Sequence, residues 1–250
     1  MLVVNDILNY LCRLAPLQLK MDFDNCGLLL GRGDNKVSKV LLALDVTDVV
    51  VKEAIEIGAN LIVSHHPLIF SGIKALTDNK LLTLVENNIS VISMHTNLDI
   101  APGGVNDVLI SMLGAKCTDV LDEHGCGRVG MLDNELDIKE FLSICKETLK
   151  CNGLRYYSSG KKVKNLAVMG GSGGDCIDNA FKKGCDTYIT ADIKYHQFQR
   201  AAELGINLID ADHFSTENPI ISVLKDRLAD RYPDTIFVVS ELHKAIISFA

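Results

Sequence analysis

Residues able to bind a divalent metal ion occur at three separate places in the chain. Two histidines follow an apolar run in NLIVSHHPLIF, an aspartate ends the segment VISMHTNLD, and a histidine and a glutamate stand four apart in DADHFSTE. Imidazole nitrogens combined with carboxylate oxygens form a donor set that suits Zn, Fe or Mn. We predict a metal centre built from His65, His66, Asp99, His213 and Glu217.

Each signal has a simpler alternative when it is taken alone. Adjacent strand residues face opposite ways, so His65 and His66 are expected to serve separate ions, and Pro67 holds His66 in an extended conformation. One of the two could instead be a core hydrogen-bonder and the other a solvated residue. Asp99 could be a turn residue before APGGVND.

The third signal is also open to two interpretations. A spacing of four stacks His213 and Glu217 on one helix face, where a glutamate can bridge two ions. Alternatively, Ser215 or Thr216 caps a helix and Glu217 complements its dipole. Three such signals in one chain are much less expected by coincidence than any single one, and this favours the metal centre.

Two further segments could contact a ligand. The glycine-rich segment VMGGSGGD, residues 168–175, could cradle a phosphate with its backbone N–H groups, or it could be a tight turn without a ligand. In YITADIKYHQ, residues 188–197, Asp192, Lys194 and His196 could contact substrate, although surface ion pairing explains them almost as well.

The elements that must position these residues form an α/β pattern. Short runs rich in Val, Ile and Leu alternate with amphipathic segments, which is typical of βα units around a buried sheet. Strands are expected at 40–44, 60–64, 90–94, 166–169, 187–190, 207–209 and 235–239. Helices are expected at the N-terminus and at 48–57, 79–88, 106–113, 138–150, 175–183, 195–204 and 219–231.

The chain is expected to contain two α/β lobes. Residues 118–134 are richer in Gly, Asp and His and less periodic, which indicates a boundary there. Lobe one would then cover residues 1–124 and be joined by the C-terminal residues 213–250. Lobe two would cover residues 125–212.

The bulk composition excludes several classes of protein. The 250 residues carry a formal charge of −7, so nucleic acid is not an expected partner. No apolar run approaches the length of a membrane span, and the N-terminus has polar residues at helical intervals and no cleavage site. Eight scattered cysteines without a CxxC pair are expected to be reduced thiols. We therefore expect a cytoplasmic protein.

The ordered motifs resemble a known family, the type-two GTP cyclohydrolase homologues, also called NGG-interacting-factor-three-like proteins. The resemblance spans nearly the whole chain and rests on DNCGLLLG, LLALDVT, SHHPLIF, HTNLDIAPGGVND, GGSGGD, YITADIKYHQ and DADHFSTE. The family commonly has a DAGH-type sequence before the last histidine, whereas this chain has Asp210, Ala211 and Asp212. Longer members carry an inserted middle domain, so this chain resembles the short form.

The resemblance implies a dinuclear metal centre with two divalent ions per subunit. It implies that His65 and Asp99 bind one ion, that His66 and His213 bind on or near the other, and that Glu217 bridges them. His95 resembles the family's additional histidine beside the centre. The resemblance also implies two interlocked α/β lobes with mixed sheets flanked by helices, and a toroidal homohexamer.

Two functional hypotheses follow. In the first, the chain is a metal-dependent hydrolase in which His95 or His196 acts as general acid on a small-molecule substrate. The resemblance suggests a nucleotide, GTP, with attack on the imidazole carbon of guanine and release of formate. In the second, the chain is a non-catalytic metal-binding or metal-delivery protein, or an oligomeric scaffold.

Overall fold

The chain folds into two compact units of mixed α/β structure. The computed structural model describes residues 1–249. The first unit contains Met1–Pro102 and Ile220–Lys244, and the second contains Gly103–Pro219 together with the residues after Lys244. The chain therefore leaves the first unit after Pro102, returns to it at Ile220 and leaves it again after Lys244.

The first unit is built on a five-stranded sheet. Its order is β1 (Gly27–Leu30), β4 (Ser90–Ser93), β3 (Leu61–Ser64), β2 (Lys39–Ala43) and β11 (Ile236–Val239). Only β1 runs antiparallel to its neighbour, β4. The three central strands are buried on both faces, which explains their continuous apolar sequence.

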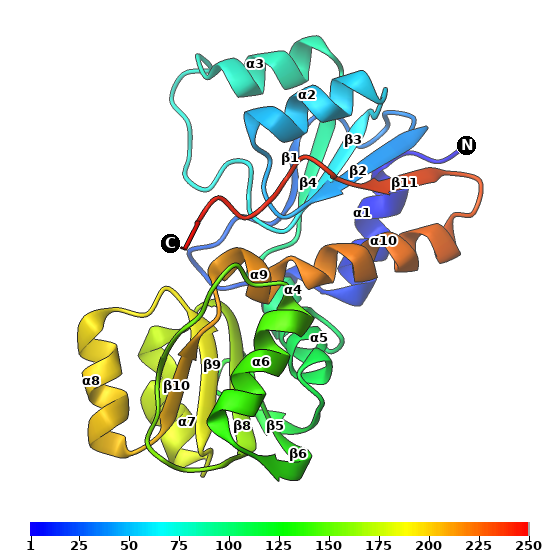
Figure 1. Ribbon diagram of the computed structural model, residues 1–250. Coiled ribbons are helices and arrows are strands. Elements are labelled where there is room, and N and C mark those ends of the chain that lie inside the picture. The colour runs from blue at the N-terminus through cyan, green and yellow to red at the C-terminus, as the bar shows by residue number, and fades with distance from the viewer. Residues whose placement is uncertain (250) are drawn as a thin grey trace. The chain divides into compact units, whose positions relative to one another are not determined.

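Helices cover both faces of this sheet. Figure 1 shows α2 (Asp48–Glu56) and α3 (Asn79–Glu86) together on one side, with α1 (Val4–Leu14) and α10 (Pro219–Arg231) on the other. The short helix α4 (Thr96–Ile100) follows β4, and a 3-10 turn, η1 (Leu17–Leu19), follows α1. The side chains of Thr47 and Asp78 accept backbone N–H groups at the starts of α2 and α3, which fixes where these helices begin.

The second unit is built on a six-stranded sheet. Its order is β5 (Ala115–Val120), β6 (Arg128–Leu136), β8 (Val163–Ser172), β9 (Thr187–Ala191), β10 (Asn207–Asp210) and β7 (Arg155–Tyr157). Strands β8, β9 and β10 are parallel, β6 and β7 pair with them in antiparallel fashion, and β5 pairs antiparallel with β6. The parallel centre brings the ends of β9 and β10 to the same edge of the sheet.

Helices also cover both faces of the second sheet (Figure 1). Helices α5 (Val105–Met112) and α6 (Ile138–Leu149) pack on one face, against residues such as Leu166 and Ile189. Helices α7 (Ile177–Lys182) and α8 (Tyr195–Leu204) pack on the other, around the fully buried Tyr188. The remaining elements of the unit are η2 (Gly174–Cys176) and the five-residue helix α9 (His213–Glu217).

The expected elements are present, and the structure adds strands that the sequence did not indicate. All seven expected strands and all eight expected helices have counterparts. Strands β1, β5, β6 and β7 were missed, and each pairs with a neighbour in antiparallel fashion. Strands β5, β6 and β7 lack a continuous apolar run because much of their surface is exposed, whereas β1 is apolar but only four residues long. Residues 118–134, expected to form a boundary, are largely the hairpin of β5 and β6.

The compact units and the expected lobes divide the chain at different residues. Residues 103–124 and 213–219 belong to the second unit, because β5 pairs with β6 and α9 packs on β8 and β9. The lobes expected from the sequence, 1–124 with 213–250 and 125–212, stay a prediction.

Candidate metal centre

Two histidines follow β3, a central strand of the first unit. His65 is fully buried, and its Nδ1 lies 2.8 Å from the carbonyl oxygen of Met94. His66 is partly exposed, and its Nδ1 lies 2.7 Å from Oδ1 of Asp45, which follows the neighbouring strand β2. Both rings are therefore held in place by acceptors from adjacent strand ends.

The two histidines do not face opposite ways, contrary to the sequence-based expectation. Their ring centres lie 5.0 Å apart, and the ring of His95 lies 5.2 Å from that of His65. One donor atom from each of the three lies within 4.8 Å of the others. The reason is that β3 ends at Ser64, so the alternation of a strand no longer applies to the residues after it.

The segment after β4 adds a carboxylate and the third histidine. Oδ1 of Asp99, on α4, lies 3.6 Å from Nε2 of His65. His95 precedes α4, and its Nδ1 lies 2.8 Å from Oδ1 of Asp24. The first unit thus brings His65, His66, His95 and Asp99 together at one end of its sheet.

Asp24 anchors this segment; it is the first residue of the motif DNCGLLLG, but no role was predicted for it. It is buried, and it accepts the Thr96 backbone N–H at 3.0 Å in addition to the His95 ring. Burial alone would raise the pKa of Asp24, but the hydrogen bonds from His95 and Thr96 hold that pKa well below its usual range. Asp24 therefore stays ionised and fixes the orientation of His95.

Asp45 joins His66 to a second histidine from the end of the chain. Nε2 of His243 lies 3.1 Å from Oδ2 of Asp45, while Oδ1 of the same carboxylate accepts from His66. Burial would raise the pKa of Asp45, and the hydrogen bonds from His243 and His66 lower it well below its usual range. The motif LLALDVT contains this aspartate, but nothing in the sequence connects it to residue 243.

In the second unit, His213 and Glu217 lie on one face of α9, as their spacing predicts. Nε2 of His213 lies 3.0 Å from Oε2 of Glu217, and Nδ1 lies 2.7 Å from Oδ2 of Asp192. Burial alone would lower the pKa of His213, but the hydrogen bonds and charges of Glu217 and Asp192 raise it to about 9. Glu217 is itself buried.

The glycine-rich segment makes room for this pair. Gly171 has φ +65°, and a Cβ there would collide with Oε1 of Glu217 and would lie 3.1 Å from Nε2 of His213. The backbone N–H of Gly171 donates to the Thr216 hydroxyl at 3.0 Å, and that of Gly170 donates to the Asn106 side chain at 2.9 Å. Strand β8 continues through Ser172, so these glycines allow close approach of α9.

A buried carboxylate holds the two loops around His213. Asp210 accepts the backbone N–H of Ile193 at 3.0 Å and that of Asp212 at 3.3 Å, and it pairs with Arg155. Asp192 and Asp212 both have positive φ, at 56° and 65°. Position 212, where the family commonly has glycine, is therefore a backbone position that suits glycine.

His196 stands apart from these clusters. It is exposed at the start of α8. Among residues 1–249, the groups of side chains able to share a metal ion do not include it. A role for His196 as general acid stays a prediction, and the geometry gives more support to His95.

All four clustered histidines are oriented in the same way. A carbonyl or carboxylate oxygen accepts from Nδ1 of His65, His66, His95 and His213. Because such an oxygen can only accept, Nδ1 carries a proton, and Nε2 is the nitrogen that would bind a metal; in His213 it faces Oε2 of Glu217 at 3.0 Å. Metal-binding histidines in proteins have this outer partner almost without exception. The donor sets of both units therefore fit a divalent cation.

Comparison with known proteins shows the family to which the chain belongs. The family model described as Duf34/NIF3 (NGG1p interacting factor 3) matches residues 2–245. The chain belongs to this family. Among relatives named "GTP cyclohydrolase 1 type 2 homolog", that of Clostridium perfringens is 37% identical and covers 98% of this chain and 99% of its own. The relative from Clostridium acetobutylicum is 39% identical, and the match covers 91% of this chain and 90% of the relative.

Solved structures of Duf34/NIF3 proteins share the whole fold. The Staphylococcus aureus hypothetical protein SA1388 superposes with a TM-score of 0.92 at 30% identity, covering 99% of each chain. Reduced HcgD from Methanocaldococcus jannaschii gives a TM-score of 0.85 at 31% identity, covering 96% of this chain and 98% of its own. The mixed α/β fold expected from the sequence is confirmed.

A search for membrane-spanning segments agrees with the composition. Within residues 1–249, every helix is too short or too polar to cross a bilayer.

Proposed function

We propose that this Duf34/NIF3 protein is a metal-dependent hydrolase with two divalent ions, Zn, Fe or Mn, at each chain. The ions would be held by His65, His66, Asp99, His213 and Glu217. The observation that carries the proposal is the shared orientation of the histidines, in which an oxygen acceptor faces each Nδ1, as it does in metal-binding histidines of other proteins. The carboxylates of Asp99 and Glu217 lie beside His65 and His213 respectively.

The chemistry of such a centre is hydrolysis. Divalent ions would supply Lewis acidity that makes water nucleophilic near neutral pH. His95 is the proton donor in this proposal, because Asp24 fixes its ring and its side chain is 18% exposed. A donor with some access to solvent can recover its proton after each turnover.

The names of the relatives suggest the substrate. A GTP cyclohydrolase reaction would consume two waters at the imidazole carbon of guanine. One water opens the ring to a formamide, and the second releases the carbon as formate. We propose that the substrate is GTP or a related purine nucleotide. We also propose that the protein acts in the cytoplasm. All eight cysteines are free thiols, which fits a reducing compartment.

The burial of two donors favours a second candidate function. His65 is fully buried and Glu217 is 4% exposed, whereas a catalytic centre needs an open coordination position. A closed site would suit a protein that stores or delivers a metal, or an oligomeric scaffold. The two functions share the same ligands and differ in turnover.

The experiment measures metal per chain and turnover together. His66→Ala and Glu217→Ala are each expected to lower the metal content while the circular dichroism spectrum stays that of a folded protein. His124→Ala, at an exposed histidine outside the clusters, is the matched control. Full metal occupancy in both site variants would contradict the proposal.

Turnover separates the two candidate functions. Purified protein is incubated with GTP and with a panel of nucleotides and phosphoesters, with and without added Zn, Mn or Fe, and formate and phosphate are quantified. Formate release that depends on metal and is lost in His66→Ala supports the hydrolase. Stoichiometric metal with no turnover of any substrate supports storage or delivery.

A further inference from the structure

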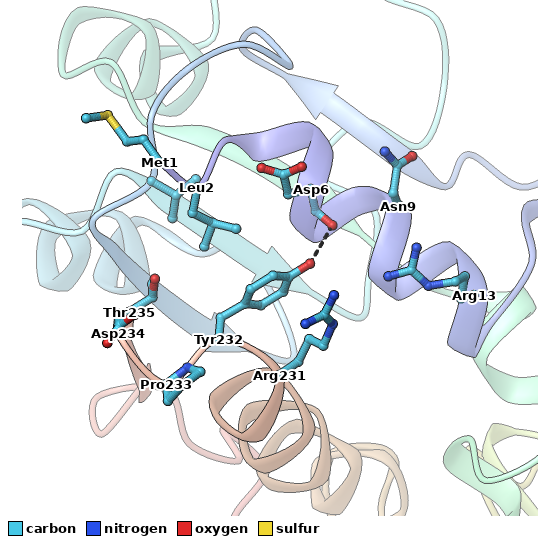
Figure 2. A pocket seen from close by; sticks show the side chains of 11 residues that line it. Met1, Leu2, Asp6, Asn9, Arg13, Arg231, Tyr232, Pro233, Asp234 and Thr235 are labelled. Atoms are coloured by element: carbon cyan, nitrogen blue, oxygen red, sulfur yellow. Dashed lines mark hydrogen bonds between the residues drawn. The ribbon is translucent and has the colours of Figure 1, made fainter.

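The first unit contains a cavity that the proposed metal centre does not use. Its volume is about 660 Å³, which is within the range of small-molecule sites. Helix α1, the end of α10 and the turn before β11 form it, and Arg13, Arg231 and Tyr232 are among its lining residues (Figure 2). None of the candidate metal ligands lines it.

Arg13 and Arg231, which line this cavity, have a different kind of partner from most other arginines of the chain. Arg32, Arg128, Arg155 and Arg200 each form an ion pair with an aspartate. Within residues 1–249, no ion pair joins Arg13 or Arg231 to a carboxylate. Their guanidinium groups lie over tyrosine rings instead, which leaves the N–H edges of each group available to an anion.

Each of these two exposed arginines lies over a tyrosine ring. The guanidinium carbon of Arg13 lies 5.6 Å from the ring centre of Tyr10, and that of Arg231 lies 5.2 Å from the ring centre of Tyr232. The two rings pack edge to face, 5.9 Å apart. Each hydroxyl donates to a backbone carbonyl, Tyr10 to Arg227 at 3.2 Å and Tyr232 to Asp6 at 3.0 Å. Two positive charges thus lie over one packed pair of aromatic rings.

Two acidic residues, Asp6 and Asp234, also line the cavity, and within residues 1–249 neither forms an ion pair with these arginines. The carboxylate of Asp6 accepts the Val3 backbone N–H at 2.9 Å, as part of the start of α1. In Figure 2, Asp234 lies beside Thr235, away from the guanidinium groups of Arg13 and Arg231. Each arginine also lies in the last turn of its helix, where a cation complements the helix dipole. The helix dipole explains why a positive residue lies at each helix end. It does not explain why both of these arginines line the same cavity.

We propose that this cavity binds the phosphoryl group of a small phosphate ester, with Arg13 and Arg231 as its ligands. Two guanidinium forks match the charge and the oxygen geometry of a phosphate. The apolar side chains of Leu2, Val37 and Pro233 line the same cavity and suit an organic substituent. The site is separate from the metal centre and does not depend on it.

Isothermal titration of the full-length protein with phenyl phosphate, at constant ionic strength, tests the proposal. One ligand is expected per chain. Arg13→Gln and Arg231→Gln are each expected to weaken binding by at least about tenfold, the size of a lost charge-assisted hydrogen bond. Arg32→Gln is the matched control, since Arg32 is exposed and pairs with Asp34 in another loop, and its affinity should equal that of the unchanged protein.

Three further arms complete the design. His66→Ala should bind phenyl phosphate as tightly as the unchanged protein, which separates this site from phosphate bound at a metal. Arg231→Lys keeps the positive charge but loses the forked guanidinium group. Its affinity for phenyl phosphate should lie between that of the unchanged protein and that of Arg231→Gln. Inorganic phosphate should bind more weakly than phenyl phosphate, and equal affinity would assign the site to free phosphate. The proposal would be overturned if the unchanged protein did not bind phenyl phosphate. It would also be overturned if Arg13→Gln and Arg231→Gln bound it as tightly as the unchanged protein does.

Discussion

At the scale of single residues, the candidate centre depends on side chains that bind no metal themselves. Asp45, Asp24 and Asp192 each accept from Nδ1 of one histidine, and a backbone carbonyl does so for the fourth. These outer partners select which ring nitrogen carries the proton. The histidines could be found from their sequence motifs, whereas most of their partners could not.

Asp212 gives a prediction at this scale. Its φ of 65° and ψ of 136° lie in a region that side chains adopt only under strain, and its carboxylate accepts the Ser215 hydroxyl at 3.0 Å. Asp212→Ala keeps the strain and loses the hydrogen bond, whereas Asp212→Gly relieves the strain. We expect the glycine variant to exceed the alanine variant by about 1 to 2 kcal/mol in free energy of unfolding, measured by urea denaturation. Equal stabilities would show that the backbone at position 212 is relaxed.

At the scale of elements, β8 and α9 must approach closely for Glu217 to reach its position. Gly171→Ala places a methyl group against Glu217 in a strained backbone conformation. We expect a loss of about 1 to 3 kcal/mol in free energy of unfolding and a lower metal content.

The control for this prediction is Gly184→Ala. Gly184 has φ +76° and open space around its Cβ position. It should show the backbone strain without the loss of metal, as measured by elemental analysis. Metal loss of the same size in both variants would point to general destabilisation.

The C-terminal segment is a second element that acts on the centre. The backbone N–H of Ser240 donates to Leu42 on β2 at 2.8 Å, and the N–H of Glu241 donates to the buried carboxylate of Glu53 at 2.9 Å. These bonds hold the chain beside β2 so that His243 reaches Asp45. The segment thereby helps to position His66 through Asp45.

This arrangement predicts that His243→Phe weakens metal binding by about tenfold, as changes to the outer partners of metal ligands commonly do. Competition with a chelator measures the affinity, and the visible spectrum of the cobalt-substituted protein reports the geometry at His66. His243→Gln keeps an N–H donor and should restore part of the affinity, and His124→Phe should have no effect. Unchanged affinity and spectrum in His243→Phe would exclude this positioning role.

At the scale of the whole molecule, the proposed ligands come from both compact units. His65, His66 and Asp99 belong to the first unit, and His213 and Glu217 belong to the second. The family resemblance further implies a toroidal homohexamer. We expect sedimentation equilibrium to give the mass of six chains of 27.3 kDa. A monomeric or dimeric mass at micromolar concentration would contradict this expectation.

The sequence by itself determined the fold class, the central strands and the choice of candidate ligands. It could do so because buried parallel strands are continuous apolar runs, and because polar residues directly after them lie at the edge of the sheet where ligands bind. It also placed His213 and Glu217 on one helix face, since a helical spacing of four is a local property.

Only the tertiary structure decided the contacts between distant residues. The pairing of Asp45 with His243, the anchoring of His95 by Asp24 and the space that Gly171 leaves for Glu217 each join segments far apart in the chain. The exposed antiparallel strands and the turn of His65 towards His66 also depend on neighbours. Such contacts leave no periodic pattern in the sequence, because packing rather than local backbone preference determines them.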